Sequence, residues 1–227
     1  MPFVRVYLVR HGETQENRDG VFQGQLDTEL NETGVRQARL VADALRSVHF
    51  DAAYSSDLRR ALKTAEIILA HRSDIEIRRE EALRERFLGS LQGTKVVAGR
   101  LEGLAVDATV ETADAFAARA ARWWTRAVLQ RSRALAPRET AYTVLVASHG
   151  GVIGTLARTL VGSRMVRCAP GVQITTCRNS SVTVIDVESD GRGTIVLYGD
   201  VEHLERGLEE EMVETNADEA VVDAGDS

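Results

Sequence analysis

The chain has 227 residues, of which 44% are hydrophobic and 27% charged, a composition typical of a globular protein with a buried core. Its formal net charge of −6 argues against a uniformly basic nucleic-acid-binding surface. Two cysteines provide no disulfide framework, and no stretch is long and apolar enough to span a bilayer. The first residues resemble a strand rather than a secretory leader. We therefore expect a cytoplasmic or nucleocytoplasmic protein with no membrane or nucleic-acid partner.

Strand and helix patterns alternate along the first half of the chain. Runs of β-branched and aromatic residues predict strands, and apolar residues repeated at helical spacing predict amphipathic helices. Ser56-Asp57 resembles a cap at the start of the second helix. The predicted elements are strands over residues 3–9, 52–55 and 75–77, and helices over 35–45 and 58–69.

The second half begins with a weakly patterned segment, residues 94–110, which predicts a mobile insertion. A long helix is predicted over 111–134, ending before Pro137. We interpret residues 94–137 together as a small helical cap. The elements expected after the cap are strands over 143–147, 181–187 and 194–198, the last two forming a hairpin, and a helix over 152–160.

This alternation of short strands and helices predicts a single α/β domain over residues 1–206, built as a three-layer α/β/α sandwich with a mostly parallel sheet. Residues 207–227 are acidic and poor in large apolar side chains, so a disordered tail is expected. Ligands of such sheets bind beyond the carboxyl ends of the strands. Arg10-His11-Gly12 and Ser148-His149-Gly150 both follow predicted strands, which makes them the first candidates for a functional site.

Four motif blocks share a characteristic order and spacing. They are Arg10-His11-Gly12-Glu13-Thr14 with Asn17 and Gln23-Gly24, then Ser55-Ser56-Asp57-Leu58-Arg59-Arg60-Ala61, then Leu83-Arg84-Glu85-Arg86, and finally Ser148-His149-Gly150-Gly151. Over residues 3–200 the chain resembles the histidine phosphatase superfamily, also called the phosphoglycerate mutase-like family. The stretches from Arg10 to Gly34 and from Ser55 to Gly93 look most like the TIGAR branch of fructose-2,6-bisphosphatases. The resemblance implies a phosphoglycerate mutase-like fold.

The chemistry of phosphate transfer explains these residue types. Two guanidiniums can neutralise a phosphate monoester and grip its oxygens, and Arg10 and Arg60 match those positions. A neutral imidazole can attack phosphorus, and the resemblance makes His11 the nucleophile. We expect a backbone carbonyl to hold the other ring nitrogen of His11 and so fix its tautomer. The resemblance places His149 against the charge that develops in the transition state.

The leaving alkoxide needs a proton, and Glu85 is the candidate general acid that later acts as base toward water. The resemblance adds Asn17, Gln23, Gly24 and Gly150 to the predicted substrate-binding set. A nearby substrate dianion raises the pKa of a carboxyl, whereas neighbouring arginines lower it, and the sequence leaves that balance open.

The scheme requires no metal and no cofactor. His49, His71 and His203 show no metal-ligand spacing and are predicted to be surface residues. The aromatic residues of the 111–134 helix are expected to pack in the core, and its arginines are expected mostly to face solvent.

The predicted partner is a small phosphorylated metabolite, with fructose 2,6-bisphosphate as the specific candidate and a broad-specificity phosphomonoesterase as the alternative. Lys95, Arg100 and Arg119 are candidates for selecting the substrate. A phosphoglycerate mutase is disfavoured because the segment between Glu85 and His149 is short and leaves the site open to water. A non-catalytic phosphate-binding protein is disfavoured because nucleophile, acid and arginines are all present. The oligomeric state is left undefined.

Overall fold

The computed structural model describes residues 4–95, 108–135 and 140–205. Its centre is a seven-stranded sheet in the order β3-β2-β4-β1-β6-β7-β5. Of the six adjacent pairs among these strands, four run parallel, as predicted, and the pairs β1–β6 and β6–β7 run antiparallel. The strands are β1 (Val4–Arg10), β2 (Ala52–Ser55), β3 (Ile77–Arg79), β4 (Tyr142–Ser148), β5 (Val166–Cys168), β6 (Val182–Val187) and β7 (Gly193–Asp200).

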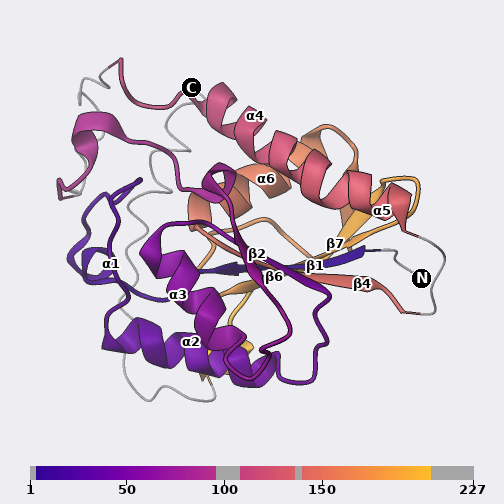
Figure 1. The fold of residues 1–227 in the computed structure, drawn as a ribbon. Coiled ribbons are helices and arrows are strands. Elements are labelled where there is room, and N and C mark those ends of the chain that lie inside the picture. Colours follow the sequence, from indigo (N-terminus) through magenta and orange to yellow (C-terminus); the bar gives the residue numbers. More distant parts are fainter. Residues whose placement is uncertain (1–3, 96–107, 136–139, 206–227) are drawn as a thin grey trace.

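Helices cover both faces of this sheet, which confirms the three-layer α/β/α prediction (Figure 1). One face carries α2 (Glu32–Ala44) and α3 (Arg59–Ile68). The other carries α4 (Ala113–Trp124), a π-helical turn over Thr125–Leu129, α5 (Gln130–Ala134) and α6 (Gly150–Gly162). Shorter helices are α1 (Gln15–Asp19), α7 (Glu202–Glu205) and two 3-10 turns at Glu81–Leu83 and Gly89–Leu91.

Side chains alternate across the sheet and form one core on each side, as the period of two in a strand requires. Val4, Val6 and Leu8 of β1 pack with Phe116 and Trp123 of α4. Val9 of β1 belongs to a second cluster, in the opposite core. This cluster also contains Val41, Leu45, Phe50, Ala53, Ile68, Leu69, Leu145, Val182 and Val184. The predicted core position of the aromatic residues in α4 is confirmed, because Phe116, Trp123 and Trp124 are all buried.

Two predicted helix starts are wrong in detail. Asn31 caps α2 by accepting a hydrogen bond from Gly34 N, so the helix begins at Glu32 rather than at residue 35. The N-cap of α3 is Leu58, which makes no side-chain capping bond. Asp57, predicted as part of that cap, instead forms an ion pair with Arg84.

The long helix predicted over 111–134 is present, interrupted by the π turn, and it ends at Ala134 before Leu135 turns extended. Residues 96–107, Pro137 and the predicted acidic tail 207–227 lie outside the described residues, so the mobile insertion and the disordered tail stay predictions. So do the domain bounds. Among the described helices, none has the length and apolar character needed to cross a membrane.

Candidate active site

Three neighbouring parallel strands, β2, β4 and β1, end at the same edge of the sheet and bring the two predicted histidines together. Arg10 pairs with Ser148 at the ends of β1 and β4, and His11 N donates to Ser148 O at 2.9 Å. The next residue after β1 and the next residue after β4 are both histidines. The rings of His11 and His149 lie with their centroids 5.1 Å apart, and both residues are buried.

The hydrogen bonds of His11 define its tautomer. Nδ1 lies 2.7 Å from the carbonyl oxygen of Gly12, which can only accept, so Nδ1 carries a proton. Nε2 lies 3.3 Å from Nε of Arg60, which can only donate, so Nε2 presents its lone pair. Burial, followed by the charges of Arg60 and Arg10, lowers the pKa of His11 well below its ordinary value. The predicted carbonyl contact is confirmed, and the imidazole is neutral.

Both predicted arginines lie beside this ring, and backbone carbonyls orient them. Arg60 is the second residue of α3, lies on the inner face of the helix and is fully buried. Its Nη1 donates to Leu26 O at 2.6 Å, and its Nη2 donates to Gly24 O at 2.7 Å. Arg10, at the end of β1, donates from Nη1 to Cys177 O at 2.6 Å. Arg60 thus donates to Nε2 of His11, and the charge of Arg10 acts on the same ring. Two oriented planar donor groups around one imidazole suit the binding of a phosphate.

His149 is oriented by Ser56, which was predicted as a helix cap and not as a site residue. Its Nε2 lies 2.9 Å from Oγ of Ser56, the residue after β2. Its Nδ1 is buried and has no hydrogen-bond partner among the described residues. Burial, with Arg60 next, lowers the pKa of His149 well below its ordinary value. One nitrogen of this ring is therefore fixed by the protein and the other is left to contact a ligand.

Glu85 is buried and contacts the start of α6, the helix whose N-cap is His149. Its Oε2 accepts from Gly151 N at 2.9 Å, and its Oε1 accepts from Arg86 N at 2.8 Å. A Cβ atom at position 151 would lie only 2.3 Å from Oε1 of Glu85, so glycine at this position makes room for the carboxylate. Gly150, predicted to bind substrate, is buried at the first position of α6.

The remaining predicted contacts belong to the loop between β1 and α2, and they hold that loop in shape. Oδ1 of Asn17 accepts from Thr14 N at 3.2 Å and so caps α1. Oε1 of Gln23 accepts from the hydroxyls of Thr14 and Thr28. Gly24 has a φ of 49° and supplies the carbonyl that orients Arg60. Gly24 reaches the site of His11 through Arg60, and Asn17 reaches it through Asn179, which binds His11 O.

Sequence reasoning missed two further contacts. Oγ1 of Thr64, one turn after Arg60, accepts from Gly12 N at 3.1 Å, and this four-residue helical spacing was a usable signal. Nδ2 of Asn179 donates to His11 O at 3.1 Å and to Oδ1 of Asn17 at 3.2 Å. Asn179 lies in a loop between β5 and β6, where no periodic pattern marks it.

Some expectations need correction. Arg119 does not lie on a solvated face, because its guanidinium is mostly buried and binds Glu111 and three backbone carbonyls, and its role toward substrate stays a prediction. His203 is half-buried rather than on the surface, and its Nε2 donates to Ser180 O at 3.0 Å. His49 and His71 are exposed, as predicted. Gly12 packs against backbone, since a Cβ there would lie 2.4 Å from Gly34 O.

Two other candidates concern selectivity and metals. Lys95 is exposed and pairs its backbone with Val21, and Arg100 lies outside the described residues. Within the part of the chain that the structure describes, no group of three or more histidine, cysteine, aspartate or glutamate side chains is arranged to hold a metal ion.

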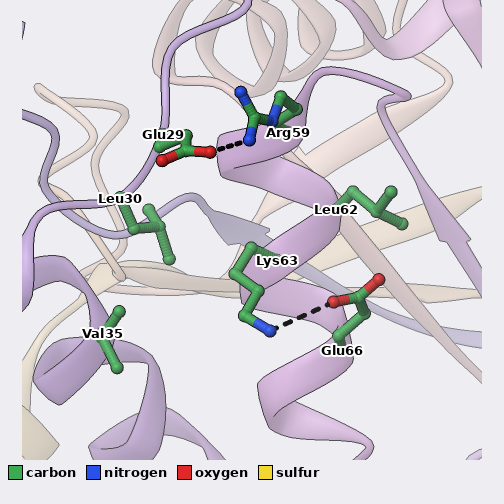
Figure 2. Close-up of a pocket in the computed structure, with 7 residues that line it drawn as sticks. All are labelled: Glu29, Leu30, Val35, Arg59, Leu62, Lys63 and Glu66. Carbon is green, nitrogen blue, oxygen red and sulfur yellow. Dashed lines mark hydrogen bonds and ion pairs between the residues drawn. The ribbon is translucent and has the colours of Figure 1, made fainter.

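A separate hollow of about 390 Å³ lies on the exposed face of α3 (Figure 2). Its charged side chains pair with one another, Arg59 with Glu29 and Lys63 with Glu66. Arg60, by contrast, is on the buried face of the same helix, against His11. We therefore place the chemistry at the strand ends and not in this hollow.

Comparisons with known proteins agree with this geometry. The family model described as "Histidine phosphatase superfamily (branch 1)" matches residues 6–201. A Schizosaccharomyces pombe protein named "Probable phosphatase C1687.21" is 32% identical over 89% of this chain and 96% of its own length. The Saccharomyces cerevisiae "Broad-specificity phosphatase YOR283W" is 30% identical over 90% of this chain and 89% of its own.

Two further matches bear on the expected relatives and fold. The Danio rerio "Fructose-2,6-bisphosphatase TIGAR B" is 47% identical, but over only 38% of this chain and 35% of its own length. A solved structure of phosphoglycerate mutase from Bacillus anthracis str. Sterne superposes with a TM-score of 0.73 at 27% identity, covering 90% of this chain and 96% of that one. The predicted phosphoglycerate mutase-like fold is confirmed, and the likeness to the TIGAR branch is limited to part of the chain.

Proposed function

Because this chain belongs to the histidine phosphatase superfamily and is a phosphoric monoester hydrolase, we propose that it works through a phosphohistidine formed on Nε2 of His11. The observation that carries this proposal is the tautomer of that ring. Nδ1 is committed to Gly12 O, and Nε2 keeps its lone pair beside the guanidinium of Arg60. A neutral, oriented imidazole with an available lone pair is the form that attacks phosphorus.

In the first step, Nε2 of His11 attacks phosphorus and the bond from phosphorus to the ester oxygen breaks. Glu85, as the carboxylic acid, gives its proton to the departing oxygen, so the alcohol leaves neutral. Arg10 and Arg60 hold the phosphoryl oxygens and balance their charge. The products of this step are a phosphohistidine, a free alcohol and a Glu85 carboxylate.

In the second step, water attacks the phosphohistidine and Glu85 takes a proton from that water. The phosphorus–nitrogen bond breaks, the electron pair returns to Nε2 of His11, and inorganic phosphate leaves. His149 supports both steps, since its buried Nδ1 has no partner among the described residues and is available to the equatorial oxygens. A donor held in place before the reaction costs no reorganisation during it.

Small phosphorylated metabolites are the proposed substrates, and two candidate specificities have different support. The identity with a fructose-2,6-bisphosphatase supports fructose 2,6-bisphosphate, but it covers 38% of this chain. The match to a broad-specificity phosphatase covers 90% and favours activity on many monoesters. Ranking kcat/KM over a panel of monoesters and bisphosphates, with chelator present, separates them: one dominant value supports the bisphosphate, and a flat profile supports broad specificity.

The mechanism itself is tested with two variants. We expect His11→Ala to lose turnover and the acid-labile phosphoenzyme together, because the substitution removes Nε2, the proposed acceptor of the phosphoryl group. We expect Glu85→Gln to lower kcat/KM for an alkyl phosphate by on the order of 100-fold, and that for p-nitrophenyl phosphate far less, since nitrophenolate leaves without a proton. Full activity in the His11 variant, or equal loss for both esters in the Glu85 variant, would overturn these roles.

A further inference from the structure

Glu85 lies in a segment, residues 84–88, that belongs to no helix or strand. A backbone of this kind has no ladder of hydrogen bonds to fix it, so other groups must satisfy its carbonyls. Gln25 Nε2 donates to Glu85 O at 3.0 Å from one side. The contacts on the other side come from α4.

Arg119 of α4 supplies those contacts. Its Nη1 donates to Ala82 O at 2.9 Å and to Arg84 O at 2.8 Å, and its Nη2 donates to Glu85 O at 3.2 Å. One guanidinium thus binds three carbonyls in the four residues that end at Glu85. The side chain is only 18% exposed, and its guanidinium also lies over the ring of Phe116, with its carbon 5.0 Å from the ring centroid.

Glu111 completes the arrangement by fixing both partners. Its carboxylate accepts from Nε and Nη2 of Arg119 at 2.9 and 2.8 Å, which is a bidentate pair. The backbone of Glu111 also binds the segment directly, because Glu111 N donates to Phe87 O and Nε of Arg86 donates to Glu111 O. Glu111, just before α4, and Arg119 within it are therefore joined to the acid-bearing segment by charged and backbone bonds on both sides of Glu85.

We propose that Arg119 is a positioning residue for Glu85, through which α4 holds the general acid in reach of the leaving group. This inference rests on the acid role proposed for Glu85. Arg119 does not touch substrate; it acts by fixing the backbone from which the carboxylate projects. The rate of proton transfer depends steeply on that placement, because a shift of about 1 Å costs on the order of 100-fold.

The planar guanidinium is essential to this role. Five donors in a fixed plane bind three carbonyls and a carboxylate at once, whereas a lysine ammonium has three donors at one point. Arg119→Lys keeps the charge but cannot reach every acceptor, and Arg119→Gln removes the charge as well. The two variants therefore separate loss of geometry from loss of charge.

The experiment compares kcat/KM for an alkyl phosphate with that for p-nitrophenyl phosphate, a ratio that reports the step in which the leaving group departs. We expect Arg119→Gln to lower the alkyl phosphate value by about tenfold or more and the nitrophenyl value by less than about threefold, with Arg119→Lys intermediate. Arg122→Gln, an exposed arginine on the same helix, is the matched control and should leave both values unchanged.

A double variant distinguishes the possible failures. In a Glu85→Gln background, Arg119→Gln should change the ratio no further, because both act on one proton transfer. If Glu85→Gln changes the ratio and neither Arg119 variant does, the positioning role is wrong while the acid role stands. If Glu85→Gln leaves the ratio unchanged, the acid role itself is wrong. Should Arg119→Gln fail to fold in thermal unfolding, the lysine variant carries the test, and a parallel loss for both esters would refute the proposal.

Discussion

Replacing Gly151 with alanine tests the placement of Glu85 by adding one methyl group. The new Cβ would lie 2.3 Å from Oε1 of Glu85 and 2.9 Å from its Cδ. Ordinary van der Waals contact begins near 3.4 Å, so the carboxylate must move by roughly 1 Å. That movement also strains its hydrogen bonds to Gly151 N and Arg86 N. A displacement of this size predicts a loss on the order of 100-fold in proton transfer to the leaving group.

The assay is kcat/KM for an alkyl phosphate beside p-nitrophenyl phosphate, with thermal unfolding measured on the same preparations. Gly162→Ala provides the control, because it makes the same change at the end of the same helix, where a Cβ would meet nothing within 4 Å. We expect the Gly151 variant to lose most of its activity toward the alkyl ester and the Gly162 variant to lose none. Unchanged alkyl phosphate hydrolysis in a folded Gly151→Ala protein would refute the proposed position of the acid.

Two further predictions concern stability. Burial keeps the pKa values of His11 and His149 well below the ordinary 6.5, so the folded chain binds fewer protons than the unfolded chain once the pH falls below that value. The free energy of unfolding should therefore be retained above pH 6.5 and decrease below it, by up to about 1.4 kcal/mol per pH unit for each histidine. Urea unfolding across pH checks this, and a His149→Asn variant with an undiminished slope would contradict it. Gly12→Ala places a Cβ 2.4 Å from the backbone oxygen of Gly34 and should cost about 1–3 kcal/mol in the same urea assay, a result that an unchanged midpoint would exclude.

Much of the fold follows from local sequence patterns. The apolar runs that form β2 and β4 are found within one residue of their predicted bounds, because a strand covered on both faces must be continuously apolar. The cap of α3 was predicted wrongly because Ser56 and Asp57 are good capping residues that here bind other partners, His149 and Arg84. Local capping propensity does not show that residues distant in the sequence bind the capping side chains instead. The three-residue strand β5 is too short to carry a pattern.

The residues of the candidate site likewise divide into those that a local sequence pattern predicts and those that it does not. His11 and His149 were predictable because each directly follows a strand, and Arg60 because a motif carried it. Asn179 was not, since its role depends on a loop that returns to His11 from the far end of the chain. Arg119 was expected to face solvent or substrate, because helical spacing alone does not reveal that buried carbonyls lie opposite it.

The nucleophile and the acid rest on different kinds of support, and this difference has a consequence for variants. His11 and His149 adjoin strands whose backbone ladders hold them, and no single side chain can remove a ladder. Glu85 adjoins no ladder, and side chains from Gln25 and Arg119 hold its segment. One substitution can remove such a bond. Substitutions outside the site should therefore slow the departure of the leaving group more readily than they slow the transfer of the phosphoryl group to His11. Such substitutions are identified by the ratio of kcat/KM for an alkyl phosphate to that for p-nitrophenyl phosphate, and not by total activity.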